Sequence, residues 1–297
     1  MTSQPLGGPT GLWLHELDTV PWSEGRAIAQ ELESLGYGAL WFPEAVGRDA
    51  LIACTLLLDA TERMAAATGI ATIYARDAMA MNAAWRTIHA AHPGRFVLGL
   101  GVSHAPMVEG IRKTEYAKPL AAMRDYLTRM DEGLFFASNA ATPPTRVLAA
   151  LGPKMLELAR DQADGAHPYN VTPDHTKLAR DILGDGKLLA VEQKAVLSND
   201  VDAARAAARQ HLGVYLGLPN YVNNWKRLGF TDDDVANGGS DRLIDAMVVH
   251  GDEATIKARV DEHRAAGADH VCVHVLPTPE QAPMPMDVWR RLAPALV

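Results

Sequence analysis

The segment GRFVLGLGVSH, residues 94–104, has the pattern of a buried strand that ends abruptly in small and polar residues. Its apolar run predicts a strand covered on both faces, because the run is continuous rather than alternating. Gly101, Val102, Ser103 and His104 then follow at the tip of this strand. A glycine at such a tip would let a flat ligand approach the backbone closely. The segment therefore predicts one strand of a parallel sheet with a binding site at its carboxyl end.

The same transition, from a short apolar run to a longer segment with helical spacing, occurs eight times along the chain. The runs are GLWLHEL (11–17), ALWFPEA (39–45), AAATGIATIYA (65–75), RFVLGLGV (95–102), TRVLAAL (145–151), GAHPYNV (165–171), KLLAVEQKAVL (187–197) and HVCVHVL (270–276). Eight strand–helix units in about 250 residues favour an α/β fold of the (β/α)8 TIM barrel type over an open doubly wound sheet. We therefore predict one TIM-barrel domain spanning residues 1–297.

Two segments fall outside this repeat. Residues 135–144 are rich in small residues and proline, which predicts a surface loop. Residues 213–245 contain the aromatic stretch NYVNNW and the acidic turn TDDD, which indicate inserted helices over one end of the barrel. Such helices could form a substrate lid or an oligomer contact, and the sequence leaves both alternatives open.

Charge and hydropathy exclude several classes of partner. The 297 residues carry 28 basic and 36 acidic side chains, a net charge of −8, without a concentrated run of Lys and Arg. Nucleic acid is therefore not expected as a partner, because phosphate binding needs a basic face. The apolar runs are shorter than the roughly 20 residues of a membrane helix. The N-terminus lacks a secretory pattern, so we expect a cytoplasmic protein that acts on a small molecule and has no membrane partner.

The cysteine and histidine spacings do not match known metal motifs. Cys54 and Cys272 form no CxxC pair and are expected to be buried, reduced thiols. His263, His270 and His274 are close in sequence, but the first belongs to a predicted helix and the others to the last strand. We therefore predict no metal site. The absence of GxGxxG, GxxxxGKS and GxSxG from the sequence also disfavours a Rossmann site, a P-loop and a serine hydrolase.

In a TIM barrel the active site lies at the carboxyl ends of the strands, which selects two candidate catalytic residues. His104 titrates near neutrality and could donate or accept a proton, although a partly exposed loop histidine is the simpler alternative. Glu44 follows Trp41 in LWFPEA, and desolvation there would raise its pKa and make it an acid or a hydrogen-bond acceptor. A salt bridge with Arg48 is the simpler alternative for Glu44.

Other strand ends supply candidate ligand contacts. Trp13 and His15 share one face of the first strand and could lie near the floor of the pocket, although a core or rim histidine is equally compatible with the pattern. His167 and Tyr169 follow the sixth strand, again two residues apart.

A turn after the fifth strand predicts an anion site. This turn, at the start of a helix, contains Gly152, Pro153, Lys154 and Met155. The free amides and the Lys154 charge would favour a phosphate there. A simple tight turn is the alternative.

Four blocks of the sequence resemble a known family. LGYGALWFPEA (35–45), TGIATIYARD (68–77), PGRFVLGLGVSH (93–104) and GDEATIKARVDEHRAAGADHVCVHVLP (251–277) are similar to signature blocks of the luciferase-like monooxygenase superfamily, and most of all to its coenzyme F420-dependent oxidoreductases. The blocks occur in the family's order. The resemblance implies a TIM barrel that holds a deazaflavin ring at its mouth and transfers a hydride between the deazaflavin C5 and a small organic substrate.

The resemblance also implies roles for particular residues. A non-prolyl cis peptide bond is expected between Gly69 and Ile70, with Ala71 and Thr72 beside it, under the ring. The cofactor contacts would be Gly69, Ile70, Ala71, Thr72, Gly101, Val102, Ser103 and His167, with the phosphate at Gly152, Pro153, Lys154 and Met155. The substrate side would be lined by Trp13, His15, Trp41 and Tyr169. This sequence departs from the family at its proton-handling positions, where it has His104 and the pair Glu44 and Ala45.

The resemblance leaves alternatives open. An FMN-dependent monooxygenase would use the same fold, and so would a flavin-binding protein without catalytic activity. A homodimer is expected from the family likeness.

Overall fold

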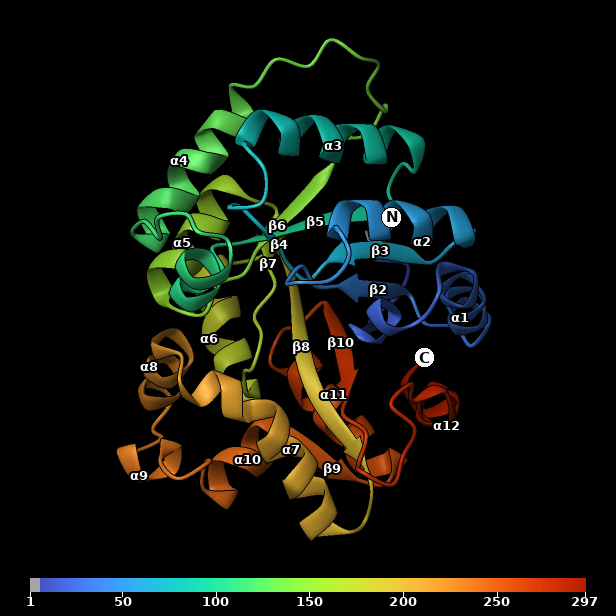
Figure 1. Ribbon diagram of the computed structural model, residues 1–297, viewed down its shortest axis with the longest axis vertical. Coiled ribbons are helices and arrows are strands. Elements are labelled where there is room, and N and C mark those ends of the chain that lie inside the picture. Colours follow the sequence, from blue (N-terminus) through green and yellow to red (C-terminus); the bar gives the residue numbers. More distant parts are fainter. Residues whose placement is uncertain (1–5) are drawn as a thin grey trace.

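Parallel strands close into a barrel around which the helices are arranged (Figure 1). The computed structural model describes residues 6–297. The barrel strands are β1 (Thr10–Trp13), β2 (Ala39–Phe42), β3 (Ala65–Thr68), β5 (Phe96–Gly101), β6 (Thr145–Leu148), β7 (Gly165–Ala166), β8 (Leu188–Leu197) and β10 (His270–Val275). β10 pairs with both β1 and β8, which closes the ring. The predicted strands and the predicted TIM barrel are thereby confirmed.

The helices cover the outside of this ring. They are α1 (Trp22–Ser34), α2 (Ala50–Ala60), α3 (Ala78–Ala91), α4 (Pro119–Asp131), α5 (Pro153–Gln162), α6 (Pro173–Leu183), α7 (Val201–Leu216), α11 (Glu253–Ala265) and α12 (Met286–Leu296). Asp49 and Asp200 accept hydrogen bonds from backbone amides at the starts of α2 and α7, as N-cap residues do. Pro153 and Pro173 occupy first turns. Across residues 6–297, none of the helices is both long and apolar enough to span a bilayer.

The predicted insertion is helical. Residues 213–245 include α8 (Pro219–Arg227), α9 (Asp232–Val235) and most of α10 (Asp241–Met247), which gather around α7 in Figure 1. Tyr221, Trp225 and Phe230 are buried in a hydrophobic cluster with Leu212 of α7. The short strand β9 (Val248–Gly251) follows and pairs with the end of β8. Nothing in the sequence analysis predicted β9, because its four residues follow the insertion directly and give too short an apolar run.

Large and small residues fill the barrel interior together. Ala65 and Ala67 of β3 leave space that the fully buried Trp41 occupies. The Trp41 ring stacks on His167 with centroids 4.1 Å apart and an interplanar angle of 12°. Trp41 Nε1 donates a hydrogen bond to His270 Nε2 at 3.1 Å. The interior is therefore packed by aromatic and imidazole rings rather than left as a channel.

The glycines of β5 make room for the chain that follows β3. Gly99 N donates to Thr68 Oγ1 at 2.9 Å, and Thr68 Oγ1 donates to the Gly99 carbonyl at 2.7 Å. A Cβ on Gly99 would lie 2.0 Å from the Thr68 carbonyl oxygen, and a Cβ on Gly101 would lie 2.4 Å from Ile70 Cδ1. The sequence analysis assigned the space at Gly101 to a ligand. That interpretation is corrected here, since the Ile70 side chain occupies this space.

We predict that Gly99→Ala destabilises the fold by about 3 kcal/mol, because the added methyl group collides with backbone that cannot move aside. Urea denaturation followed by circular dichroism measures the change. Gly110→Ala is the matched control, since a Cβ at Gly110 meets nothing within 4 Å, and it should change the free energy of unfolding by less than about 1 kcal/mol. Equal stability of Gly99→Ala and wild type would contradict the packing described.

The buried histidines predict a loss of stability in mild acid. Burial lowers the pKa of His270 from 6.5 to about 4. Below pH 6.5, His270 is therefore protonated in the unfolded chain, whereas in the folded chain it stays neutral down to about pH 4. The free energy of unfolding falls as the pH is lowered through this window. Between pH 7 and pH 5.5 the loss from this one histidine is about 1 kcal/mol. In urea titrations, His270→Gln should lose less stability than wild type over the same interval by that amount. If the free energy of unfolding depended on pH in the same way in both proteins, the lowered pKa of His270 would be refuted.

Candidate active site

The carboxyl ends of the barrel strands, here called the mouth, carry the polar and partly exposed residues. The strands themselves are almost entirely buried. Past their ends, Ile70, Val102, Ala149, Leu151 and Tyr169 are half-buried, and His15 is exposed. At the mouth, side chains that follow many different strands are therefore partly accessible to solvent. This is expected for an active site in this fold.

The segment from Gly69 to Thr72 forms a bulge at the end of β3. The peptide bond between Gly69 and Ile70 is cis, as the family resemblance implies. The short strand β4 (Ala71–Thr72) then pairs with β5. Trp13 Nε1 donates to the Gly69 carbonyl at 2.8 Å, and a Cβ on Gly69 would lie only 2.7 Å from this nitrogen. Trp13 thus fixes the bulge from the neighbouring side of the barrel.

Glu44 holds the other end of the bulge. Its carboxylate accepts a hydrogen bond from Thr72 N at 2.9 Å and pairs with Arg76 at 2.5 Å. Only 5% of the Glu44 side chain is exposed, and both oxygens are engaged. The predicted salt bridge with Arg48 is wrong, since Arg48 contacts Asp18 instead. These contacts make Glu44 an anchor for the bulge, and they leave the acid role that the sequence suggested without structural support.

His104 lies between the tip of β5 and the insertion. The preceding residue, Ser103, has a φ of 54°, which turns the chain at the strand end. The His104 ring lies 5.6 Å from the Tyr221 ring of α8. Burial lowers the pKa of His104, and a hydrogen bond with Asn220 of α8 acts in the opposite direction. The insertion therefore forms part of the wall of the mouth and covers the candidate catalytic histidine.

The predicted aromatic residues separate into two groups. Trp13 and Tyr169 meet with ring centroids 5.2 Å apart, and His15 lies 6.1 Å from Trp13. Trp41, by contrast, is fully buried in the barrel interior, so the structure does not support its predicted contact with substrate. Its stacking partner His167 is also buried, and burial lowers the His167 pKa to about 4. A neutral imidazole is therefore expected at His167 at neutral pH.

A buried charged cluster completes the mouth, and the sequence analysis missed it. Lys194 Nζ lies 2.6 Å from Glu192 Oε1 and 3.6 Å from the centre of the Tyr169 ring. Burial lowers the pKa of Lys194 to about 8. Tyr169 Oη lies 3.0 Å from Tyr215 Oη of α7, and the His274 ring on β10 lies 4.3 Å from Trp13. The signal was present in the sequence, because two charges spaced i, i+2 in an apolar strand must share one face.

The turn after β6 combines a helix start with a cationic side chain. Gly152 is the N-cap of α5 and Pro153 begins its first turn. Lys154 is exposed and lines a groove between α4 and α5, while Met155 packs against the core. A Cβ on Gly152 would lie 3.8 Å from Arg227 Nη2 at the end of α8. The guanidinium of Arg227, which the sequence did not indicate, therefore lies beside this helix start.

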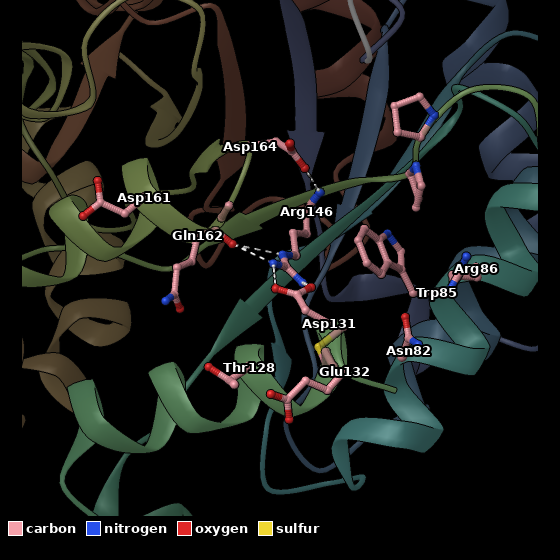
Figure 2. Close-up of a pocket in the computed structure, with 14 residues that line it drawn as sticks. Asn82, Trp85, Arg86, Thr128, Asp131, Glu132, Arg146, Asp161, Gln162 and Asp164 are labelled. Atoms are coloured by element: carbon pink, nitrogen blue, oxygen red, sulfur yellow. Dashed lines mark hydrogen bonds and ion pairs between the residues drawn. The ribbon is translucent and has the colours of Figure 1, made fainter. Parts of the chain in front are cut away.

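A cavity of about 680 Å³ lies at the opposite end of the barrel. Figure 2 shows Arg146, at the start of β6, at its centre. Arg146 pairs with Asp131 at 2.6 Å and donates to the Gln162 carbonyl at 2.8 Å, and its backbone amide donates to Asp164. The guanidinium of Arg146 is thus held by Asp131 and by the Gln162 carbonyl, and this face of a TIM barrel usually serves stability. The predicted site residues lie at the other end.

The chain is similar in sequence to a described protein family and to a named relative. The sequence profile described as luciferase-like monooxygenase matches residues 7–270. A relative from Mycobacterium tuberculosis, named as a candidate coenzyme F420-dependent oxidoreductase, is 24% identical over 330 aligned positions. The alignment covers 90% of this chain and 95% of the relative.

Solved structures share the fold. An F420-dependent secondary alcohol dehydrogenase in complex with an F420–acetone adduct superposes with a TM-score of 0.77 and 14% identity, covering 98% of this chain and all of that one. The oxygenating component of a Pseudomonas putida 3,6-diketocamphane monooxygenase, in complex with FMN, gives a TM-score of 0.69 and 13% identity, covering 98% and 99% of the two chains. At these identities the likeness establishes a common barrel architecture.

Proposed function

The chain belongs to the luciferase-like monooxygenase family, and we propose that it is a coenzyme F420-dependent oxidoreductase that transfers a hydride between the deazaflavin C5 and a small organic substrate. The observation that carries the proposal is the bulge at Gly69, which Trp13 and Glu44 hold at the mouth. The names of the mycobacterial relative and of the alcohol dehydrogenase support F420 as the cofactor.

The mouth fits a planar ring. His167 Nε2 is buried without a hydrogen-bond partner among residues 6–297, and it faces Gly69, where a Cβ would lie 3.3 Å away. A buried polar atom of this kind is uncommon without a ligand or a water. Ile70 and Val102 are half-buried at the same end of the barrel and offer apolar surface. A flat, largely apolar ring with polar edges matches this combination.

The turn at the start of α5 fits the anionic tail of the cofactor. The amide of Lys154 lies in the first turn of this helix, where backbone donors and the helix dipole favour a phosphate. Arg227 adds a guanidinium on the facing side, and such a group binds phosphate oxygens through charge-assisted hydrogen bonds. The ring and the tail would thus be held by different strand ends of one barrel.

The residues of this chain supply binding, orientation and a proton, whereas bound F420 supplies a carbon that carries the hydride. Trp13 and Tyr169 form the wall against which a substrate would be oriented. Tyr221 and α8 limit the access of water near His104. The lowered pKa of His104 favours its neutral form at pH 7, so its free ring nitrogen would accept the hydroxyl proton of an alcohol as the hydride leaves.

An FMN-dependent monooxygenase is the second candidate, favoured by the structural likeness to the FMN complex. Titration of the cofactor-free protein with F420 and with FMN, followed by fluorescence, separates the two candidate functions.

We predict saturable binding of F420 and at least about tenfold weaker binding of FMN. Arg227→Ala should weaken F420 binding about tenfold through loss of a charge-assisted contact. Arg146→Met, at the opposite end, is the control and should leave the affinity unchanged. Tighter binding of FMN would overturn the F420 assignment.

We predict that His104→Ala lowers kcat by about 100-fold or more, since a positioned acid–base group contributes 10² to 10⁴ in rate. The dissociation constant of F420 should change less than about threefold, because the imidazole is assigned to the proton and not to the cofactor. Steady-state rates over a panel of alcohols, aldehydes and enones provide the measurement. His92→Ala, which removes a histidine paired with Asp59 outside the mouth, is the matched control. An unaltered rate in the His104 variant would remove this residue from the mechanism.

A further inference from the structure

Two histidines and a glutamate converge at one side of the mouth. His15 follows β1, Glu16 begins the 3₁₀ helix Glu16–Thr19, and His274 belongs to β10. Strands β1 and β10 are paired neighbours, which brings residues from opposite ends of the chain together. One ligand atom from each of the three side chains lies within 4.8 Å of the others.

Two atoms of this group are buried acceptors without partners. His274 Nε2 and Glu16 Oε2 are both inaccessible to solvent and form no hydrogen bond within the described part of the chain. The relative exposure of His274 is 0% and that of Glu16 is 5%. Leaving such atoms unsatisfied costs folding free energy, because each has lost its hydrogen bonds to water. Two such atoms within one cluster of three potential ligands indicate that something further binds there.

The hydrogen bonds around His274 fix its tautomer. His274 Nδ1 lies 3.2 Å from Glu192 Oε1, so Nδ1 carries the hydrogen and donates a hydrogen bond to this carboxylate. Glu192 is itself held by Lys194 Nζ at 2.6 Å and by Asn170 N at 3.1 Å. The lone pair of His274 Nε2 therefore remains free. A carboxylate behind the imidazole in this way is the usual support of a metal-binding histidine.

We propose that His15, Glu16 and His274 bind a divalent transition-metal cation of the zinc class. Two imidazoles and one carboxylate are a common donor set for such ions at open sites. His15 Nδ1 lies 3.8 Å from Glu16 Oε2, close to the roughly 3.4 Å that separates ligands of a tetrahedral zinc with 2.1 Å bonds. The His15 side chain is 52% exposed, so solvent reaches this one ligand, and a water that completes the site would enter from the His15 side.

The local charges are compatible with a cation. The ammonium of Lys194 is paired with Glu192, and Glu192 lies between Lys194 and His274 as a partner of both. The carboxylate of Glu16 then faces the site with no cation of its own in residues 6–297 other than His15. A protonated Glu16 that donates to His274 Nε2 would also satisfy both atoms. That arrangement binds no metal, and it is the alternative that the experiment distinguishes.

Metal binding is tested on the tag-free, full-length chain after dialysis against a chelator. Titration with Co²⁺ is followed by visible absorption, and Zn²⁺ affinity is measured by calorimetry in the absence of any flavin cofactor. We expect one equivalent of Co²⁺ with an intense d–d band typical of tetrahedral coordination, and displacement of Co²⁺ by Zn²⁺. The proposal does not rest on the proposed function, since neither readout involves turnover or F420.

Variants assign the site. His274→Gln and Glu16→Gln should each weaken Zn²⁺ binding by about 100-fold. His15→Ala changes a half-exposed residue that the fold does not need, so it tests the site even if the buried variants are unstable. His250→Gln is the matched control, because His250 pairs with Asp245 at 3.2 Å outside the cluster, and its affinity should stay within twofold of wild type. The absence of stoichiometric binding to the wild type, or unchanged affinity in His15→Ala, would overturn the proposal.

Discussion

The close packing of β5 against Thr68 and the bulge at Gly69 is the constraint on which the structure of the mouth depends. Gly99 and Gly101 have no side chains, and the space this leaves is taken by the Thr68 carbonyl and the Ile70 side chain. Thr68 Oγ1 joins the two strands by hydrogen bonds in both directions. Once the bulge is seated, Trp13 and Glu44 can reach its two ends. This local packing thus links four strand ends of the mouth, those of β1, β2, β3 and β5.

Two ends of one barrel have different electrostatic organisation. At the end of Arg146, Asp131 and the Gln162 carbonyl hold the guanidinium, which suits a stabilising role. At the mouth, His167 Nε2, His274 Nε2 and Glu16 Oε2 remain without partners in the part of the chain that the structure describes. Unsatisfied buried atoms reduce stability, and proteins retain them mainly where a ligand or a reaction requires them. The proposed ring and metal sites would supply partners for these three atoms at the mouth.

Sequence periodicity was sufficient to predict the barrel, because each barrel strand is an apolar run followed by a segment with helical spacing. It also predicted that His104 and the turn at Gly152 lie shortly after strand ends, as the structure shows, while their roles stay predictions. Periodicity does not show which distant residues meet. Glu44 pairs with Arg76 rather than with Arg48, and that choice depends on the path of the chain after the bulge. The cluster around Lys194 lies inside an apolar run, where a charged side chain was counted as part of the strand.

The central claim is that the bulge and the neighbouring strand ends hold the ring of a deazaflavin. Hydrogen exchange of the full chain with and without F420 tests this claim most directly, because backbone amides beside a bound ligand exchange more slowly. The account predicts slower exchange confined to peptides that contain residues 69–73, 101–104 and 152–155. Unchanged exchange in these peptides at saturating F420, or protection confined to the cavity around Arg146, would contradict it.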